Sequence, residues 1–324
     1  RLLDETLTRI VIGEKVPVVL IAGNHDGPDR LGFGSRLLVE AKLIVRGMPG
    51  EDVEPVILRD AHGEVAIYPL PYAEPAMVRE LFDREDIASH NEGMAAQMDR
   101  LRAVHQPGRR SVVVAHAFVQ GGRVSESERE LSVGGSSVVE CDVFSGIQYV
   151  ALGHLHRPQT VGEGNIQYAG SLMKYSFSEA DQPKSVSLVE MDGEGRVNVE
   201  RIALKPRRDL RILEGRLQDL IDAGARDPGR EDYVKARLTD TGALLDAMGK
   251  LRVAYPNALS IERVETEGRG EGLEPGRDYR KVGLQELFSS FYEDMTGSVL
   301  DEESLTLLAD EIAVIEQGAR EVQQ

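Results

Sequence analysis

Histidine and asparagine side chains follow three apolar segments of this chain at the point where each segment ends. The segments are 16–22, 112–115 and 149–152, and the side chains that follow them are Asn24, His25, His116, His154 and His156. Each segment is mostly aliphatic or β-branched with no 3.6-residue periodicity, which predicts a strand buried on both faces. Because sites in open α/β sheets lie outside strand ends, we expect these side chains to surround one cleft.

These residue types are suited to a centre of divalent metal ions. Imidazole nitrogens and the amide oxygen of Asn bind borderline metals such as Mn, Fe or Zn, and Gly23 and Gly153 allow the backbone to turn sharply beside a crowded site. Two cations about 3.5 to 4 Å apart activate a bridging water and neutralise a phosphoryl group during in-line displacement. The pattern therefore predicts hydrolysis of a phosphoester.

Each motif taken alone has a plainer interpretation. A single histidine at the end of a buried strand, such as His116, is more often a hydrogen-bonded core residue than a ligand, and Asn24 beside Gly23 is more often part of a turn. The combination of three such strand ends favours the metal centre. The remaining histidines stand in polar or turn contexts, and we expect them at the surface: His62, His90 and His105.

Composition limits the class of protein. The net charge of -17 over 324 residues argues against a general basic surface for polyanions, although a metal site can supply the positive charge that phosphates need. Cys141 is the single cysteine, so no disulfide can form within the chain. No segment approaches the apolar length of a membrane span, and we find no secretory signal in a sequence that opens with Arg1. We expect a soluble, cytoplasmic protein.

The apolar pattern divides the chain into three segments. Residues 1–204 combine predicted helices at 2–11, 31–43 and 91–104 with further strands at 56–58, 65–69, 166–169, 186–191 and 197–204. Residues 205–267 alternate strand 210–213, helix 217–222, strand 233–238, helix 243–255 and strand 259–264, a compact α+β unit. Residues 268–324 contain the rest of a linker that begins at 267, then helices 284–295 and 302–316, with Asp301 as the N-cap of the second helix.

The strand-end motifs are similar to the later motifs of the calcineurin-like metallophosphoesterases. More narrowly, residues 23–34 (GNHDGPDRLGFG), 151–159 (ALGHLHRPQ) and 168–171 (YAGS) resemble the SbcD family, the nuclease subunits of bacterial SbcCD complexes. The likeness covers the whole chain. It implies an α/β fold, a four-layer metallophosphoesterase sandwich at 1–204, with a small α+β DNA-capping domain at 205–267 and a C-terminal helical pair within 268–324.

The resemblance also implies a role for each site residue. His25 would stabilise the transition state or protonate the leaving oxygen, and Arg157 would lie near the path of the phosphate. The cofactors would be two divalent metal ions, with Mn²⁺ expected. The ligands would be Asn24, His116 and His154 for one ion and His156 for the other. The family's first two motifs, which supply the remaining ligands and a preceding strand, are expected to lie before Arg1.

The family assignment implies a DNA-end-processing nuclease, a double-strand exonuclease and single-strand endonuclease of DNA repair, recombination and replication. Its partners would be DNA ends, an SbcC-type coiled-coil ATPase, and a second copy of the chain contacted through the helices at 2–12 and 31–43. One rival hypothesis is a general metallophosphodiesterase or phosphatase. Another is a non-catalytic fragment that binds DNA ends or the ATPase.

An apolar stripe on the helix at 284–295 is predicted to dock the ATPase. Its spacing of three and four residues is typical of a helix that inserts anchors into a partner. The members are Leu284, Leu287, Phe288, Phe291 and Tyr292. The alternative is that the stripe packs against the helix at 302–316 or against the catalytic domain.

Overall fold

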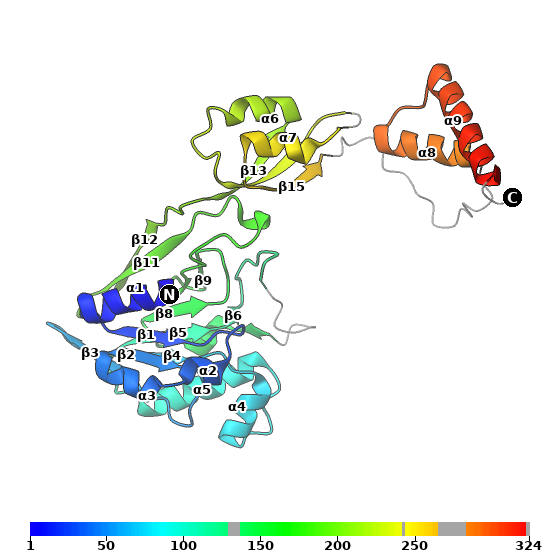
Figure 1. Ribbon diagram of the computed structural model, residues 1–324. Helices are drawn as coiled ribbons and strands as arrows, with labels where there is room; N and C mark the ends of the chain where they lie inside the picture. The colour runs from blue at the N-terminus through cyan, green and yellow to red at the C-terminus, as the bar shows by residue number, and fades with distance from the viewer. Residues whose placement is uncertain (129–136, 242–243, 265–282, 322–324) are drawn as a thin grey trace. The chain divides into compact units, whose positions relative to one another are not determined.

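A computed structural model describes residues 1–128, 137–241, 244–264 and 283–321 (Figure 1). The chain separates into two compact units, Arg1–Arg207 and Arg208–Gln324. The first unit mixes helices with several sheets, so the predicted α/β class is confirmed and the four-layer sandwich stays a prediction. Within the described residues, no helix has both the length and the apolar character needed to cross a membrane.

The largest sheet of the first unit has six strands in the order β3-β4-β5-β8-β10-β9. They are β3 (Val56–Asp60), β4 (Gly63–Leu70), β5 (Arg110–His116), β8 (Tyr149–Gly153), β10 (Ile166–Tyr168) and β9 (Gln159–Val161). β4, β5, β8 and β10 run parallel, while β3 and β9 add antiparallel edges. Because His116 pairs with Gly153 in this register, the C-terminal ends of β5 and β8 lie side by side.

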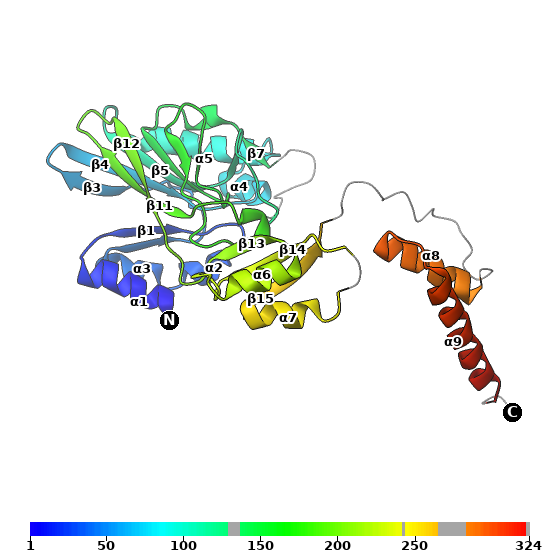
Figure 2. The ribbon, with the colours of Figure 1, turned by 90° about the horizontal axis from the view of Figure 1, so that it is seen from above.

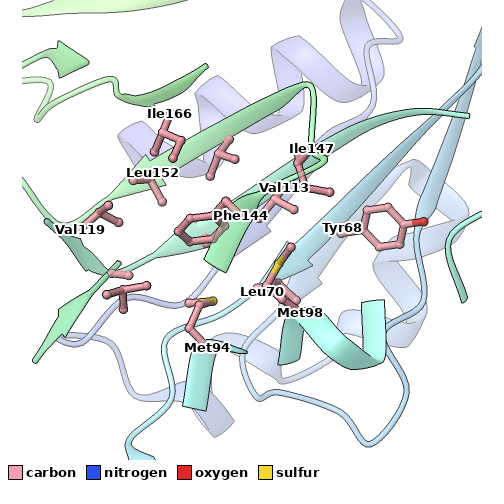
Figure 3. Packing of buried hydrophobic residues seen from close by; sticks show 14 of the residues in the cluster. Tyr68, Leu70, Met94, Met98, Val113, Val119, Phe144, Ile147, Leu152 and Ile166 are labelled. Carbon is pink, nitrogen blue, oxygen red and sulfur yellow. The ribbon is translucent and has the colours of Figure 1, made fainter. Parts of the chain in front are cut away.

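Helix α5 (His90–Val104) packs its apolar face into the core of this sheet. It begins with a capping box between Ser89 and Glu92, which satisfies free N–H groups of its first turn. Met94 and Met98 are buried in the core, in the same cluster as Phe144 (Figure 3). Met94 and Met98 are therefore ordinary core residues.

The N-terminal part forms a second, smaller sheet. Its elements are α1 (Leu2–Thr8), a π-helical turn (Arg9–Gly13), β1 (Val18–Ile21), α2 (Pro28–Gly32), α3 (Ser35–Leu38), a 3-10 turn (Val39–Ala41) and β2 (Leu43–Arg46). β1 pairs in parallel with β2, and its side chains are half-buried, so the prediction of burial on both faces is wrong for this strand. Strand β2 was not predicted. The left-handed backbone of Gly34 (φ 73°) and Lys42 (φ 63°) divides the expected helix at 31–43 and starts the strand early.

The other elements of the first unit complete the framework. They are α4 (Pro75–Phe82), β6 (Phe118–Val119), β7 (Val138–Val139), 3-10 turns at Cys141–Phe144 and Phe177–Glu179, and the hairpin strands β11 (Ser185–Met191) and β12 (Val197–Ala203). Strands were predicted at 186–191 and 197–204, and the structure pairs them as an antiparallel hairpin. Helix α4 was missed because it is short and begins at a proline, Pro75, inside a polar stretch.

The second unit contains a three-stranded parallel sheet with two helices (Figures 1 and 2). Its elements are β13 (Leu210–Gly215), α6 (Leu217–Gly224), β14 (Tyr233–Leu238), α7 (Ala247–Ala254) and β15 (Ala258–Arg263). One apolar cluster joins α6 and α7 to β14, so both helices cover the same face of the sheet. The predicted alternation of strands and helices is confirmed, and the predicted linker at 267–276 lies outside the described residues.

Two helices end the described chain, α8 (Leu284–Thr296) and α9 (Glu302–Glu321), and they contact each other. Asp301 Oδ1 accepts a hydrogen bond from the Ser304 N–H at 2.8 Å, which confirms the predicted N-cap. Most of the apolar stripe on α8 is exposed. Leu284 and Phe291 are each 59% accessible, Phe288 is 45% accessible, and Leu287 is 37% accessible.

Candidate functional site

The five side chains predicted to share a cleft line one cavity of about 180 Å³. The lining residues are Asn24, His25, His116, Glu128, Gly153, His154, Leu155, His156, Gly170 and Ser171. They come from the loop after β1, the last residues of β5 and β8, the residues directly after β8, and the segments at 128 and 170–171. The structure therefore brings the five together, while the role of each stays a prediction.

A tight turn places the first two of these residues. The Gly23 N–H donates to Asp26 Oδ2 at 2.8 Å, and the Asp26 N–H donates back to the Gly23 carbonyl at 3.2 Å. Asp26 thus closes the turn, and Asn24 Oδ1 lies 2.9 Å from His116 Nε2. His25 is exposed at the mouth of the cavity, where it can contact a bound molecule.

The imidazole of His116 lies between two glycines. A Cβ atom on Gly23 would lie 2.6 Å from His116 Cε1, and one on Gly153 would lie 2.9 Å from His116 Nδ1. No larger residue fits at either position without moving the ring. Burial, with a smaller contribution from His154, lowers the pKa of His116 to about 4, so the ring is neutral at pH 7.

His154 occupies a strained backbone position. Its φ of 113° lies in the left-handed region that non-glycine residues rarely adopt, and such outliers cluster at functional sites. Its ring meets that of His116 edge to face, with centroids 5.3 Å apart. Burial, followed by the charges of His156 and His25, lowers the pKa of His154 to about 4. Both rings therefore have the neutral form that binds metal ions.

His156 is held at its ring and at its backbone. Its Nδ1 lies 2.8 Å from Glu179 Oε1 and 3.0 Å from Ser127 Oγ, while its N–H donates to Glu128 Oε1 at 2.5 Å. The ring also contacts that of Tyr175, with centroids 5.3 Å apart. With Nδ1 occupied, the other ring nitrogen is the one left to bind a ligand.

Glu179 is fully buried and anchors a small polar network. Its Oε2 accepts a hydrogen bond from Lys184 Nζ at 2.6 Å, and Ser127 Oγ donates to Oε1. Burial raises the pKa of Glu179, but hydrogen bonds from Lys184, Ser127 and His156 outweigh it and lower the pKa to about 2. Four residues of this network were not predicted from the sequence: Ser127, Glu128, Glu179 and Lys184. They stand in polar segments without helical or strand periodicity, so the pattern contained no signal of their burial.

The role predicted for Arg157 stays a prediction, whereas the surface position predicted for His90 is wrong. Arg157 is absent from the cavity lining. Its Nη2 lies 3.6 Å from Asp181 Oδ2, and such an exposed ion pair contributes little to the stability of the fold. His90 is not a surface residue, because its side chain is only 9% accessible and its Nε2 lies 3.2 Å from Tyr72 Oη. The Tyr72 ring in turn meets the ring of His116, with centroids 6.0 Å apart.

His105 is a second correction, and His62 is as predicted. His105 is half-buried, with Nδ1 2.9 Å from the buried Tyr68 Oη, and burial lowers its pKa. His105 follows the last turn of α5 and contacts Tyr68 there, a contact that the polar sequence around His105 does not predict. His62 is exposed at the turn between β3 and β4.

The donor set fits part of a metal centre. Two donor atoms about 2.1 Å from one ion and at right angles are about 3 Å apart, close to the 2.9 Å between Asn24 Oδ1 and His116 Nε2. Throughout the part of the chain that the structure describes, however, no three side chains of His, Cys, Asp or Glu are grouped closely enough to hold an ion. The residues present therefore provide some of the ligands of a metal ion but not a complete set.

Comparison with known proteins finds relatives that share both parts of the chain. Residues 206–296 match the family model SbcD_C, described as the type 5 capsule protein repressor C-terminal domain. A protein of Staphylococcus epidermidis that is named as the D subunit of the SbcCD nuclease is 29% identical over 301 residues, 93% of this chain and 79% of that protein. The protein of the same name from Staphylococcus saprophyticus is 29% identical over 321 residues, 99% of this chain and 84% of that protein. The chain is a homologue of SbcD.

The SbcD similarity includes both compact units. The matched relatives align with 93% and 99% of the chain, so the similarity includes the histidine cavity as well as the α+β unit. The family model begins at residue 206, next to the boundary between the units at Arg207. The resemblance noted from the strand-end motifs is thus confirmed.

Proposed function

We propose that this chain is the nuclease subunit of an SbcCD-type complex and hydrolyses phosphodiester bonds at DNA ends with divalent metal ions. The observation that carries the proposal is the convergence of Asn24, His25, His116, His154 and His156 on one cavity. Phosphoester hydrolysis uses such a cluster of neutral ligands beside a proton donor. The two relatives carry the name of the SbcCD nuclease, which supports DNA as the substrate.

The ligands divide into two sets in this proposal. The first set is His116, His154 and the side-chain oxygen of Asn24, and His156 belongs to the second. When bound, two divalent ions, with Mn²⁺ expected, would neutralise the charge of the phosphoryl group and activate a water molecule. The two neutral rings, the glycines that enclose His116 and the turn closed by Asp26 hold the donors in place before any ion binds.

His25 is the proposed proton donor to the leaving oxygen. It follows Asn24 directly, lines the cavity and is exposed, so it can contact a phosphodiester at the mouth of the cavity. Arg157 is a secondary candidate for contact with the DNA backbone. Its ion pair with Asp181 is long and exposed, and a phosphate could replace the carboxylate at little cost.

The second unit and the C-terminal helices supply the proposed partner contacts. We assign residues 205–267 to a cap over DNA and the stripe on α8 to an SbcC-type coiled-coil ATPase. The exposure of Leu284, Phe288 and Phe291 favours a partner surface over packing against α9. The helices near 2–12 and 31–43 are the proposed contact with a second copy of the chain.

One observation favours a second candidate function. Because the described residues lack a group of three ionisable metal ligands, a non-catalytic module that binds DNA ends or the ATPase remains a rival. A general phosphodiesterase or phosphatase would share the cavity but would not require the α+β unit or the α8 stripe.

Cleavage assays separate these functions. The purified chain is incubated with Mn²⁺ and with linear duplex DNA, single-stranded DNA or a nitrophenyl phosphate monoester. The proposal predicts DNA cleavage that a chelator abolishes and that His154→Ala removes, while the exposed control His62→Ala leaves it unchanged. Binding of DNA ends without cleavage would favour the non-catalytic module. Hydrolysis of the monoester alone would favour a phosphatase.

A further inference from the structure

We propose that Glu179, held by Lys184, is a positioning residue for His156. The pair fixes the orientation of the ring and keeps the proton on Nδ1, so that Nε2 presents its lone pair to a cation. This inference rests on the proposed function, since it concerns the residue assigned to the second metal set. It adds two residues that have no place in the strand-end motifs.

The carboxylate of Glu179 uses both oxygens inside the protein. Oε1 lies 2.8 Å from His156 Nδ1 and accepts from Ser127 Oγ, while Oε2 accepts from Lys184 Nζ at 2.6 Å and from the Tyr175 N–H at 3.3 Å. The side chain has no accessible surface. An ionised carboxylate is an acceptor only, so the nitrogen that faces it must donate. The geometry therefore places the proton of His156 on Nδ1.

Lys184 fixes the same histidine at a second point. Besides Glu179, its Nζ donates to the backbone carbonyl of His156 at 2.8 Å and to Gln182 Oε1 at 3.3 Å. The lysine side chain is only 5% accessible. Ring and backbone of His156 are thus tied to one ion pair, which limits rotation of the ring about its side-chain torsions.

Stability alone is a poor explanation for this ion pair. A buried ion pair is costly to desolvate and is often replaced by apolar residues without loss of stability. Imidazoles that bind metal ions commonly donate their other N–H to a carboxylate, which selects the tautomer and orients the ring. His156 has this arrangement, because its Nδ1 faces the Glu179 carboxylate and the residue also lines the cavity.

The test reads the tautomer directly, without metal and without activity. The chain is labelled with ¹⁵N-histidine and kept in chelator, and the ring resonances of His156 are assigned by comparison with His156→Gln. The expected result is a proton on Nδ1 in the native chain. In the double variant Glu179→Gln/Lys184→Met, which removes both charges at similar volume, that preference should be lost. A native ring protonated on Nε2, or an unchanged tautomer in the folded double variant, would overturn the proposal.

A second readout uses Mn²⁺ affinity. Loss of a carboxylate behind a metal-binding histidine lowers affinity about 10- to 100-fold, and the double variant should show a loss of this order. The matched control is Asp60→Asn, which breaks the ion pair with Arg110 at the opposite end of β5 from His116 and should leave affinity unchanged. Equal affinity in the native and double-variant chains would also overturn the positioning role. If the native chain binds no Mn²⁺ but shows the Nδ1–H tautomer, the proposed function fails while the positioning by Glu179 stands.

Discussion

His116 Nε2 lies 2.9 Å from Asn24 Oδ1, although the two residues are 92 positions apart in the chain. The contact joins the loop after β1 to the end of β5, so it connects the smaller sheet to the larger one. It depends on close approach of the backbone, because the His116 ring fills the space where Gly23 and Gly153 would have side chains.

The first prediction concerns those glycines. Gly23→Ala places a Cβ 2.6 Å from His116 Cε1, so the ring must move away from Asn24. Overpacking of this kind costs about 1–3 kcal/mol, measured by denaturant unfolding. Gly13→Ala is the matched control, since a Cβ there meets no atom within 4 Å. Equal stability of the two variants would show that the ring is not confined as described.

The second prediction concerns pH. The pKa values of His116 and His154 are lowered to about 4 in the folded chain, so the unfolded chain binds more protons between about pH 4 and 6.5. Both rings are therefore neutral in the folded and unfolded chains near pH 7, and the free energy of unfolding decreases as the pH falls through this window. The difference between the ordinary pKa of 6.5 and about 4 corresponds to about 3.4 kcal/mol per ring at 1.36 kcal/mol per pKa unit, and solvent screening of these partly accessible rings reduces it to on the order of 2–3 kcal/mol.

This pH effect is measured as a difference between variants in chelator. Unfolding free energies at pH 7 and pH 4.5 are compared for the native chain and for His116→Gln/His154→Gln. The native chain should lose more stability than the variant over this interval, and His62→Gln should behave as the native chain. The same loss in all three would contradict the burial of neutral rings.

The third prediction separates chemistry from metal binding. His25 is exposed and is not among the proposed ligands, so His25→Ala should retain Mn²⁺ while the cleavage rate falls about 10²- to 10⁴-fold, as for loss of a general acid. Metal binding is followed by calorimetry and cleavage by gel assay. A parallel loss of bound Mn²⁺ and of rate would make His25 a ligand instead.

The fourth prediction concerns the stripe on α8. Phe288→Ala/Phe291→Ala should weaken association with an SbcC-type ATPase by about 2 kcal/mol or more per anchor, because exposed aromatic residues on one helix face act as binding anchors. Thermal unfolding should be nearly unchanged. Gln285→Ala/Ser290→Ala, at exposed polar positions of the same helix, is the control. Full-strength binding by the aromatic variant, or early melting, would place the stripe in the core.

Sequence patterns predicted the residues at the strand ends better than the buried polar network that holds His156. Short apolar runs that end in ligand-type residues are a local signal, and β5 and β8 place His116 and His154 where that signal indicated. Glu179 and Lys184 have no such signal, because their burial depends on how the segment after β10 folds over His156. The missed strand β2 has a similar cause. Lys42 adopts a left-handed backbone conformation, which a lysine in the sequence does not predict, and this conformation ends the helical stretch.

Electron paramagnetic resonance of Mn²⁺ shows whether the cavity holds a divalent cation. The signal of free Mn²⁺ is recorded as the native chain, His154→Ala, Asn24→Ala and the control His62→Ala are titrated. Because the described residues provide an incomplete ligand set, we predict weak Mn²⁺ binding by the native chain and the control, and much weaker binding by the two cavity variants. Equal binding by all four chains, or no binding by the native chain, would show that the cavity does not hold a divalent cation.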